Sequence, residues 1–269
     1  MKIKYFGTAA AEAWPGMYCH CESCKRAWEL RGKNLRTRSQ ALVDDGLLID
    51  FPPDTYLHML QDGLDLPNIH HILITHTHED HLYTDDLRWR GGYYCSGEEG
   101  YLNLYGNDAL MRRMEAIEKE DTTTLRWHEW QAFETYPVMD YAVTPMLARH
   151  NPKEKCFIYH IEKDGKSLLY GNDTGIFPDA TWAYLQGKRF DVVSLDCTML
   201  IIPEGTNHMG IEDVVTVRDR MLREGIADKN TAFVITHFSH NGKLLHHEIE
   251  AAVAPYGIHV AYDGYELFF

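Results

Sequence analysis

Residues 72–81 read Ile72-Leu73-Ile74-Thr75-His76-Thr77-His78-Glu79-Asp80-His81 and place four metal-ligand side chains within six residues. The first four residues are apolar or β-branched, which predicts a buried strand that ends where the polar side chains begin. Alternate residues of an extended chain point the same way, so His76 and His78 can face one side. A loop can then fold Asp80 and His81 back onto the same cavity.

Imidazole and carboxylate groups together favour zinc, iron or manganese over calcium. One ion cannot easily use four groups from so short a run, so the pattern predicts two adjacent metal ions. A surface cluster of polar residues is the alternative. An apolar strand that leads directly into H-x-H-x-D-H makes that alternative weak.

Length and composition set the limits of the fold. The chain has 269 residues, of which 45% are hydrophobic and 12% aromatic. That is enough for a sizeable core without disulfides, in one large domain or two ordinary ones. No internal repeat, low-complexity segment or linker is visible in the sequence, so we expect a single domain over residues 1–269.

The formal net charge is −14 with histidine neutral. An acidic surface repels polyanions, so we expect a small substrate and no long nucleic acid, although a local basic patch stays open. The chain has no run of 18 apolar residues, and its first seven residues are too soon interrupted for a signal peptide. We therefore expect a cytoplasmic protein with no membrane partner. The sequence does not set the oligomeric state, and a homodimer stays among the expectations.

A second cluster lies near the N-terminus, where Cys19-His20-Cys21-Glu22-Ser23-Cys24 holds three thiols within six residues. In a reducing compartment such thiols favour metal binding over disulfides. A tetrahedral zinc needs a fourth ligand. Since Cys19 and its neighbour His20 cannot easily bind the same ion, we expect that ligand from a distant part of the chain. Free or redox-active thiols are the alternative.

Predicted strands end in His or Asp six times along the chain, at Asp50, at the run from His76 and at the four positions His150, Asp173, Asp196 and His237. His150 alone would suggest an exposed loop residue, and Asp50 could be a turn aspartate or could orient a ligand histidine. The repetition is what favours a common site, with the strands delivering ligands to one edge and helices covering the outer faces. We also expect a helix from Asn107 or Asp108 to Lys119.

These residues resemble the signature of the metallo-β-lactamase superfamily of dinuclear metal hydrolases, over nearly the whole chain. The resemblance implies an α/β (α+β) fold, a four-layer αββα sandwich. It also implies the ligands of the two active-site ions: His76, His78 and His150 for the first, Asp80, His81 and His237 for the second, and Asp173 as the bridging carboxylate. Asn172 departs from the Thr or Ser that is frequent in the superfamily.

Three further motifs are similar to those of the PhnP family of phosphodiesterases, which is associated with carbon–phosphorus bond cleavage. They are Cys-x-Cys-x-x-Cys at 19–24, Asn-His-Met-Gly at 207–210 and Thr-His-x-Ser-His-Asn at 236–241. This resemblance implies a structural zinc held by Cys19, Cys21, Cys24 and His240, and a catalytic role for His208. The segment 82–130 carries no motif that indicates a substrate.

The expected activity is hydrolysis of small phosphodiesters, cyclic ones included. Two divalent ions, zinc or manganese, can hold a bridging hydroxide that attacks phosphorus. We place Asp80 and Asp173 among the catalytic groups and take His208 as the general acid for the leaving oxygen. A surface histidine before a helix is the alternative for His208. A lactonase or thioesterase is the rival activity, and an RNA-processing nuclease is a further one that the acidic charge disfavours.

Overall fold

The computed structural model describes residues 1–97, 99–117 and 123–269, and two seven-stranded sheets form its centre. Parallel pairing joins β3 to β4, β4 to β5 and β5 to β6 in the first sheet, whereas β14, β1, β2 and β3 pair antiparallel. In spatial order the first sheet contains β14 (Tyr265–Phe268), β1 (Lys2–Gly7), β2 (Gln40–Val43), β3 (Leu47–Ile49), β4 (His71–Leu73), β5 (Leu102–Gly106) and β6 (Leu125–Glu129).

The second sheet has the same mixed character. The strands from β10 to β13 pair parallel, and those from β7 to β10 pair antiparallel. In spatial order it contains β13 (Ile258–Val260), β12 (Ala232–Thr236), β11 (Val192–Asp196), β10 (Lys166–Gly171), β9 (Phe157–Lys163), β8 (Tyr141–Leu147) and β7 (Tyr136–Val138).

The two sheets pack face to face over a shared apolar layer. Ile3 and Leu47 of the first sheet lie in one buried cluster with Val143, Tyr159 and Leu168 of the second. The opposite face of each sheet is apolar as well, so each needs a covering layer. Ile72 and Leu48, for example, belong to a separate cluster on the outer face of the first sheet.

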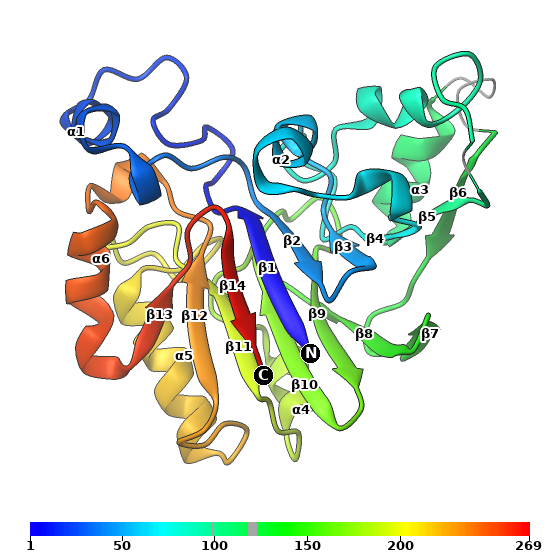
Figure 1. The fold of residues 1–269 in the computed structure, drawn as a ribbon. Coiled ribbons are helices and arrows are strands. Elements are labelled where there is room, and N and C mark those ends of the chain that lie inside the picture. The colour runs from blue at the N-terminus through cyan, green and yellow to red at the C-terminus, as the bar shows by residue number, and fades with distance from the viewer. Residues whose placement is uncertain (98, 118–122) are drawn as a thin grey trace.

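Helices supply these outer layers. The first sheet is covered by α2 (Thr55–Asp62) and α3 (Asp108–Glu115), and the second by α1 (Glu22–Leu30), α4 (Asp179–Leu185), α5 (Ile211–Arg223) and α6 (His246–Val253). Figure 1 shows α5 and α6 on the left of the view, α2 at the top centre and α3 at the upper right, with the sheets between the two groups of helices. The predicted four-layer αββα sandwich is therefore confirmed.

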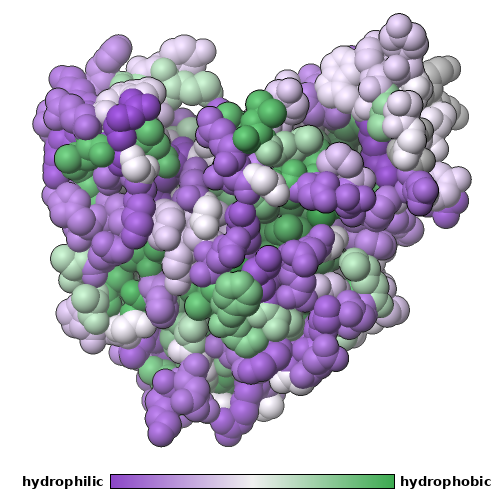
Figure 2. Space-filling view, viewed as in Figure 1, coloured by the Kyte–Doolittle hydropathy of each residue, from purple (hydrophilic) through white to green (hydrophobic). Residues whose placement is uncertain are grey.

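Short 3-10 helices complete the structure: η1 (Gly32–Asn34), η2 (Leu66–Asn68), η3 (Thr84–Arg90), η5 (His240–Gly242) and η6 (Ala254–Tyr256). The two chain ends lie side by side, because β1 pairs with β14 and the Met1 amino group donates to the Phe269 carbonyl at 3.0 Å. On the face drawn in Figure 2, hydrophilic residues predominate and hydrophobic ones gather in separate patches. Among the described residues, none of the helices has both the length and the apolar character that crossing a lipid bilayer requires.

The predicted hairpins form around Asp45 and Asp164, but two predicted boundaries move. The strand expected over residues 72–75 is β4, which ends at Leu73. It ends early because the Thr75 carbonyl turns to accept from the Phe157 N–H of the other sheet, at 2.8 Å. The helix expected to reach Lys119 is α3, whose last helical residue is Glu115; Lys119 lies outside the described residues.

Strand direction positions the site. Parallel pairing places the carboxyl ends of β3 and β4 at one edge of the first sheet, and those of β10, β11 and β12 at one edge of the second. The contact between Thr75 and Phe157 brings these edges together. Polar residues that follow these strands therefore meet at one place.

Candidate metal centre

The first predicted ligand set comes together at this shared edge. His76 and His78 follow β4, and His150 follows β8 on the other sheet. His76 Nε2 lies 2.9 Å from His78 Nδ1, and His150 Nε2 lies 3.2 Å from the same His78 nitrogen. Their nearest ligand atoms all lie within 4.8 Å of one another, which is close enough for one ion to bind all three.

The second predicted set forms beside it. Asp80 and His81 belong to the turn after His78, Asp173 follows β10, and His237 follows β12. His81 Nε2 lies 3.2 Å from Asp80 Oδ2 and 3.3 Å from His237 Nε2. His237 adopts a left-handed backbone with φ of 64°, which is rare for a residue with a β-carbon and aims its ring into the cluster.

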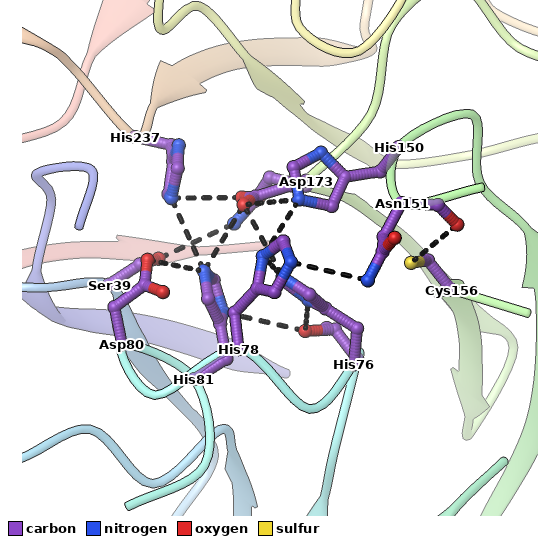
Figure 3. A network of polar contacts seen from close by, with 12 residues as sticks. Ser39, His76, His78, Asp80, His81, His150, Asn151, Cys156, Asp173 and His237 are labelled. Atoms are coloured by element: carbon purple, nitrogen blue, oxygen red, sulfur yellow. Dashed lines mark hydrogen bonds and ion pairs between the residues drawn. The ribbon is translucent and has the colours of Figure 1, made fainter. Parts of the chain in front are cut away.

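Asp173 contacts both sets (Figure 3). Its Oδ2 lies 3.2 Å from His81 Nε2, 3.8 Å from His150 Nε2 and 3.9 Å from His76 Nε2. Its Oδ1 lies 2.9 Å from His237 Nε2, but outside hydrogen-bond geometry, so this buried oxygen has no hydrogen bond. A buried carboxylate that lies between two groups of imidazoles, with one oxygen outside any hydrogen bond, fits a carboxylate that bridges two cations.

The charges around Asp173 fit cation binding as well. Burial lowers the pKa of His76 well below its usual range, helped by His81, which leaves a neutral ring able to bind metal. Burial opposes a charged His81, but Asp173, Asp80 and Asp50 raise its pKa well above the usual range. Burial likewise opposes ionised Asp173, and His237 and His81 nevertheless hold its pKa well below normal. Divalent cations would supply the positive charge that these buried carboxylates require.

Further buried groups fix the ligand rings. Asp50 Oδ2 lies 2.7 Å from His81 Nδ1, and its Oδ1 accepts from the Thr75 N–H at 2.8 Å. Asp50 is fully buried, so the structure places it behind His81, a predicted ligand, rather than in an exposed turn. The Asn207 carbonyl lies 3.1 Å from His150 Nδ1, which must then carry the proton and leave Nε2 free for metal.

His208 lies beside the centre and belongs to neither predicted ligand set, although one of its ring nitrogens lies within 4.8 Å of ligand atoms of His150 and Asp173. Its ring stacks on His237, with centroids 5.7 Å apart, and lies edge-on to His150 at 4.9 Å. Its Nδ1 lies 2.9 Å from Asp196 Oδ2. Burial lowers the pKa of His208, but Asp196 in particular outweighs it and raises that pKa to about 9.

Asp196 could itself be taken for a ligand, because it lies close to His208 and His237. Its oxygens are already used, however. Oδ1 accepts from the N–H groups of Thr198 and Met209, each at 3.0 Å, and Oδ2 accepts from Thr198 Oγ1 at 3.1 Å. Asp196 therefore orients His208, a role that its position at a strand end left open. The sequence signal for this role was the Asp-x-Thr spacing, because an aspartate side chain can accept from the N–H two residues later, as Asp196 does from Thr198.

The predicted cysteine cluster also forms. Cys19, Cys21, Cys24 and His240 have ligand atoms within 4.8 Å of one another, with His240 Nδ1 3.5 Å from Cys21 Sγ and 3.7 Å from Cys19 Sγ. The thiol pKa of Cys21 is lowered to about 7: burial opposes the shift, but the Cys24 N–H and the neighbouring side chains outweigh it. Three thiols and one imidazole are a donor set that suits tetrahedral zinc.

Comparisons with known proteins agree with this architecture. The beta-lactamase superfamily domain matches residues 47–252. A solved diphosphatase from the PhnP family is 25% identical, with a TM-score of 0.79 over 100% of this chain and 97% of that one. Zn²⁺-bound PqqB from Methylobacterium extorquens is 20% identical, with a TM-score of 0.80 over 100% of each chain.

Human tRNase Z, short form, is 18% identical, with a TM-score of 0.66 over 100% of this chain and 99% of that one. The likeness to PqqB and to tRNase Z concerns the fold alone. No curated protein sequence matches the chain.

The shared position of Asp173 predicts that its removal affects both ions. We expect Asp173→Ala to lose active-site metal and hydrolytic rate together, because one carboxylate faces both ligand sets. Elemental analysis of purified protein gives the occupancy, and Asp179→Ala, an exposed aspartate in the first turn of α4, is the control. Full metal content and normal turnover in Asp173→Ala would show that the ligand assignment is wrong.

Proposed function

This chain belongs to the metallo-β-lactamase superfamily of metal-dependent hydrolases, and we propose that it is a phosphodiesterase that acts on small phosphodiesters. The observation that carries the proposal is His208. It stands beside both ligand sets, belongs to neither, and is held by the buried carboxylate of Asp196. A histidine so placed suits proton donation to a poor leaving group such as an alkoxide.

The ligand sets support the metal-dependent part of the proposal. We take His76, His78 and His150 as ligands of one divalent cation, Asp80, His81 and His237 as ligands of a second, and Asp173 as their bridge. Zinc and manganese both suit imidazole and carboxylate donors. When bound, two such cations lower the pKa of a water molecule towards about 7 and offset negative charge on a phosphoryl oxygen.

The protein's own side chains hold the proton donor and a predicted ligand in position. Asp196 accepts from His208 Nδ1, which orients the ring and leaves Nε2 to give its proton to the departing oxygen. The Thr198 hydroxyl donates to Asp196 Oδ2 and lies 2.8 Å from His237 Nδ1. It therefore links the carboxylate that orients His208 to a predicted metal ligand. These contacts hold the groups in place before substrate binds.

Diphosphate hydrolysis is the second candidate. The solved PhnP-family structure that is 25% identical to this chain is a diphosphatase. A phosphate leaving group needs less protonation than an alkoxide, so a diphosphatase would depend less on His208. The likeness to tRNase Z concerns the fold alone, and the net charge of −14 still disfavours a polyanionic RNA substrate.

A substrate panel tests the proposal. Protein loaded with Zn²⁺ or with Mn²⁺ is assayed on alkyl and cyclic nucleotide phosphodiesters, nucleoside diphosphates, a lactone and a thioester. We expect the highest kcat/KM on a phosphodiester. A clear preference for diphosphates would select the second candidate, and turnover of only the lactone or thioester would reject phosphoryl chemistry.

His208→Ala tests the general acid. We expect this variant to keep its metal, because His208 lies outside both ligand sets, and to lose roughly 10²–10⁴-fold in rate on an alkyl phosphodiester. On a nitrophenyl diester, whose leaving group needs little protonation, the loss should be much smaller. His247→Ala, which removes an exposed histidine in α6, should match the unmodified protein on both substrates.

Two outcomes would change the assignment. Equal losses on the alkyl and nitrophenyl diesters would leave His208 a binding role and reject proton donation. Loss of metal from His208→Ala would make it a ligand.

A further inference from the structure

We propose that Glu154, which belongs to neither ligand set, is a positioning residue that holds the first metal's ligands His76 and His78 in place. Glu154 lies in the loop between β8 and β9, four residues after the ligand His150. The inference rests on the ligand set of the proposed function but not on any substrate.

The Glu154 carboxylate binds the loop that carries His76 and His78 at its middle residue, Thr77. Thr77, which separates His76 from His78, directs its N–H to both carboxylate oxygens at 3.3 Å. The Thr77 hydroxyl lies 3.2 Å from Oε1 and 3.1 Å from Oε2. Because Thr77 lies between the two histidines in the chain, holding its backbone in place restricts the backbone of both neighbours and therefore the directions of both rings.

The same carboxylate reaches two other segments. Asn151, next to the predicted ligand His150, donates from Nδ2 to Glu154 Oε1 at 3.2 Å. Figure 3 shows that the same nitrogen also faces His78, whose Nε2 lies 3.3 Å away. Asn107 donates from Nδ2 to Glu154 Oε2 at 3.3 Å. Glu154 thus joins the ligand loop to the His150 loop and to the start of α3.

Asn107 is itself held by further hydrogen bonds. Asn107 is 2% exposed, its Oδ1 caps α3 by accepting from the Leu110 N–H at 3.0 Å, and its Nδ2 also donates to the Lys155 carbonyl at 2.8 Å. Within the described part of the chain, no Lys, Arg or His forms an ion pair with Glu154. Hydrogen-bond donors of Thr77, Asn107 and Asn151 surround its charge, and Arg112 interacts with it electrostatically at longer range.

Glu154→Gln is the sharpest variant. It keeps the shape of the side chain, but both oxygen positions face nitrogen donors, so the new NH₂ group meets a donor in either orientation. Glu79→Gln is the matched control. Glu79 lies in the same ligand loop and loses the same charge, but its side chain is 82% exposed, and within the described part of the chain its one ion pair is with Arg113, at 3.9 Å.

Metal affinity is measured by competition with a chromophoric chelator, using Zn²⁺ alone, together with the melting temperature of the metal-free protein. In Glu154→Gln we expect the dissociation constant of one active-site ion to rise by roughly 10–100-fold. The metal-free melting temperature should stay near that of the unmodified protein, and Glu79→Gln should match the unmodified protein in both measurements. A merely structural contact would give the reverse pattern, with lower melting temperature and unchanged affinity.

A second pair keeps the test decisive if Glu154→Gln does not fold. Thr77→Val removes the hydroxyl donor and keeps the shape, whereas Thr77→Ser keeps the hydroxyl. We expect Thr77→Val to weaken the same ion and Thr77→Ser to bind it normally. Unchanged Zn²⁺ affinity in Glu154→Gln, or equal affinity in the two Thr77 variants, would overturn the proposal. Since no substrate is used, neither result depends on which ester the enzyme hydrolyses.

Discussion

The structure depends on one electrostatic constraint, the burial of the Asp173 carboxylate between two groups of imidazoles. Its oxygens lie 3.2 Å from His81, 2.9 Å from His237 and less than 4 Å from His76 and His150, at a position that is 2% exposed. A buried carboxylate in this setting requires nearby positive charge. Under the proposed function, two cations that share it would satisfy that need. Residues at or just after the ends of β3, β4, β10, β11 and β12 make up the arrangement.

The cysteine cluster is connected to the His and Asp cluster through the segment that follows β12. His237 and His240 are three residues apart, so the segment after β12 contributes to both clusters. Cys21 also caps α1, since its side chain accepts from the Cys24 N–H. On the far side of the imidazole, His240 Nε2 faces Glu12 Oε1 at 3.7 Å, which leaves Nδ1 directed at the thiols. A metal in this cluster would tie α1 and the loop after β1 to the segment that carries His237.

Much of this could be predicted from the sequence because the signals are local. The H-x-H-x-D-H run, the strands that end in Asp173 and His237, and the Cys-x-Cys-x-x-Cys motif each contain their own ligand-type residues. The supporting groups could not be found in the same way. Glu154 and Asn107 are ordinary loop polar residues, and only the approach of the two sheets makes them partners. Thr198 follows β11 and gains His237 from the neighbouring strand β12 of the same sheet. The length of β4 escaped prediction for the same reason, since its end is set by a contact with Phe157 of the other sheet.

The central claim is that Asp173 bridges two metal ions while a third binds apart from them. Anomalous diffraction from crystals of the metal-loaded protein, collected at the zinc and manganese absorption edges, tests it most directly. The account predicts two peaks about 3.5–4 Å apart on either side of Asp173, and a separate zinc peak among the three cysteines and His240. A single peak at the His and Asp cluster, or a pair of peaks that Asp173 does not contact, would contradict it.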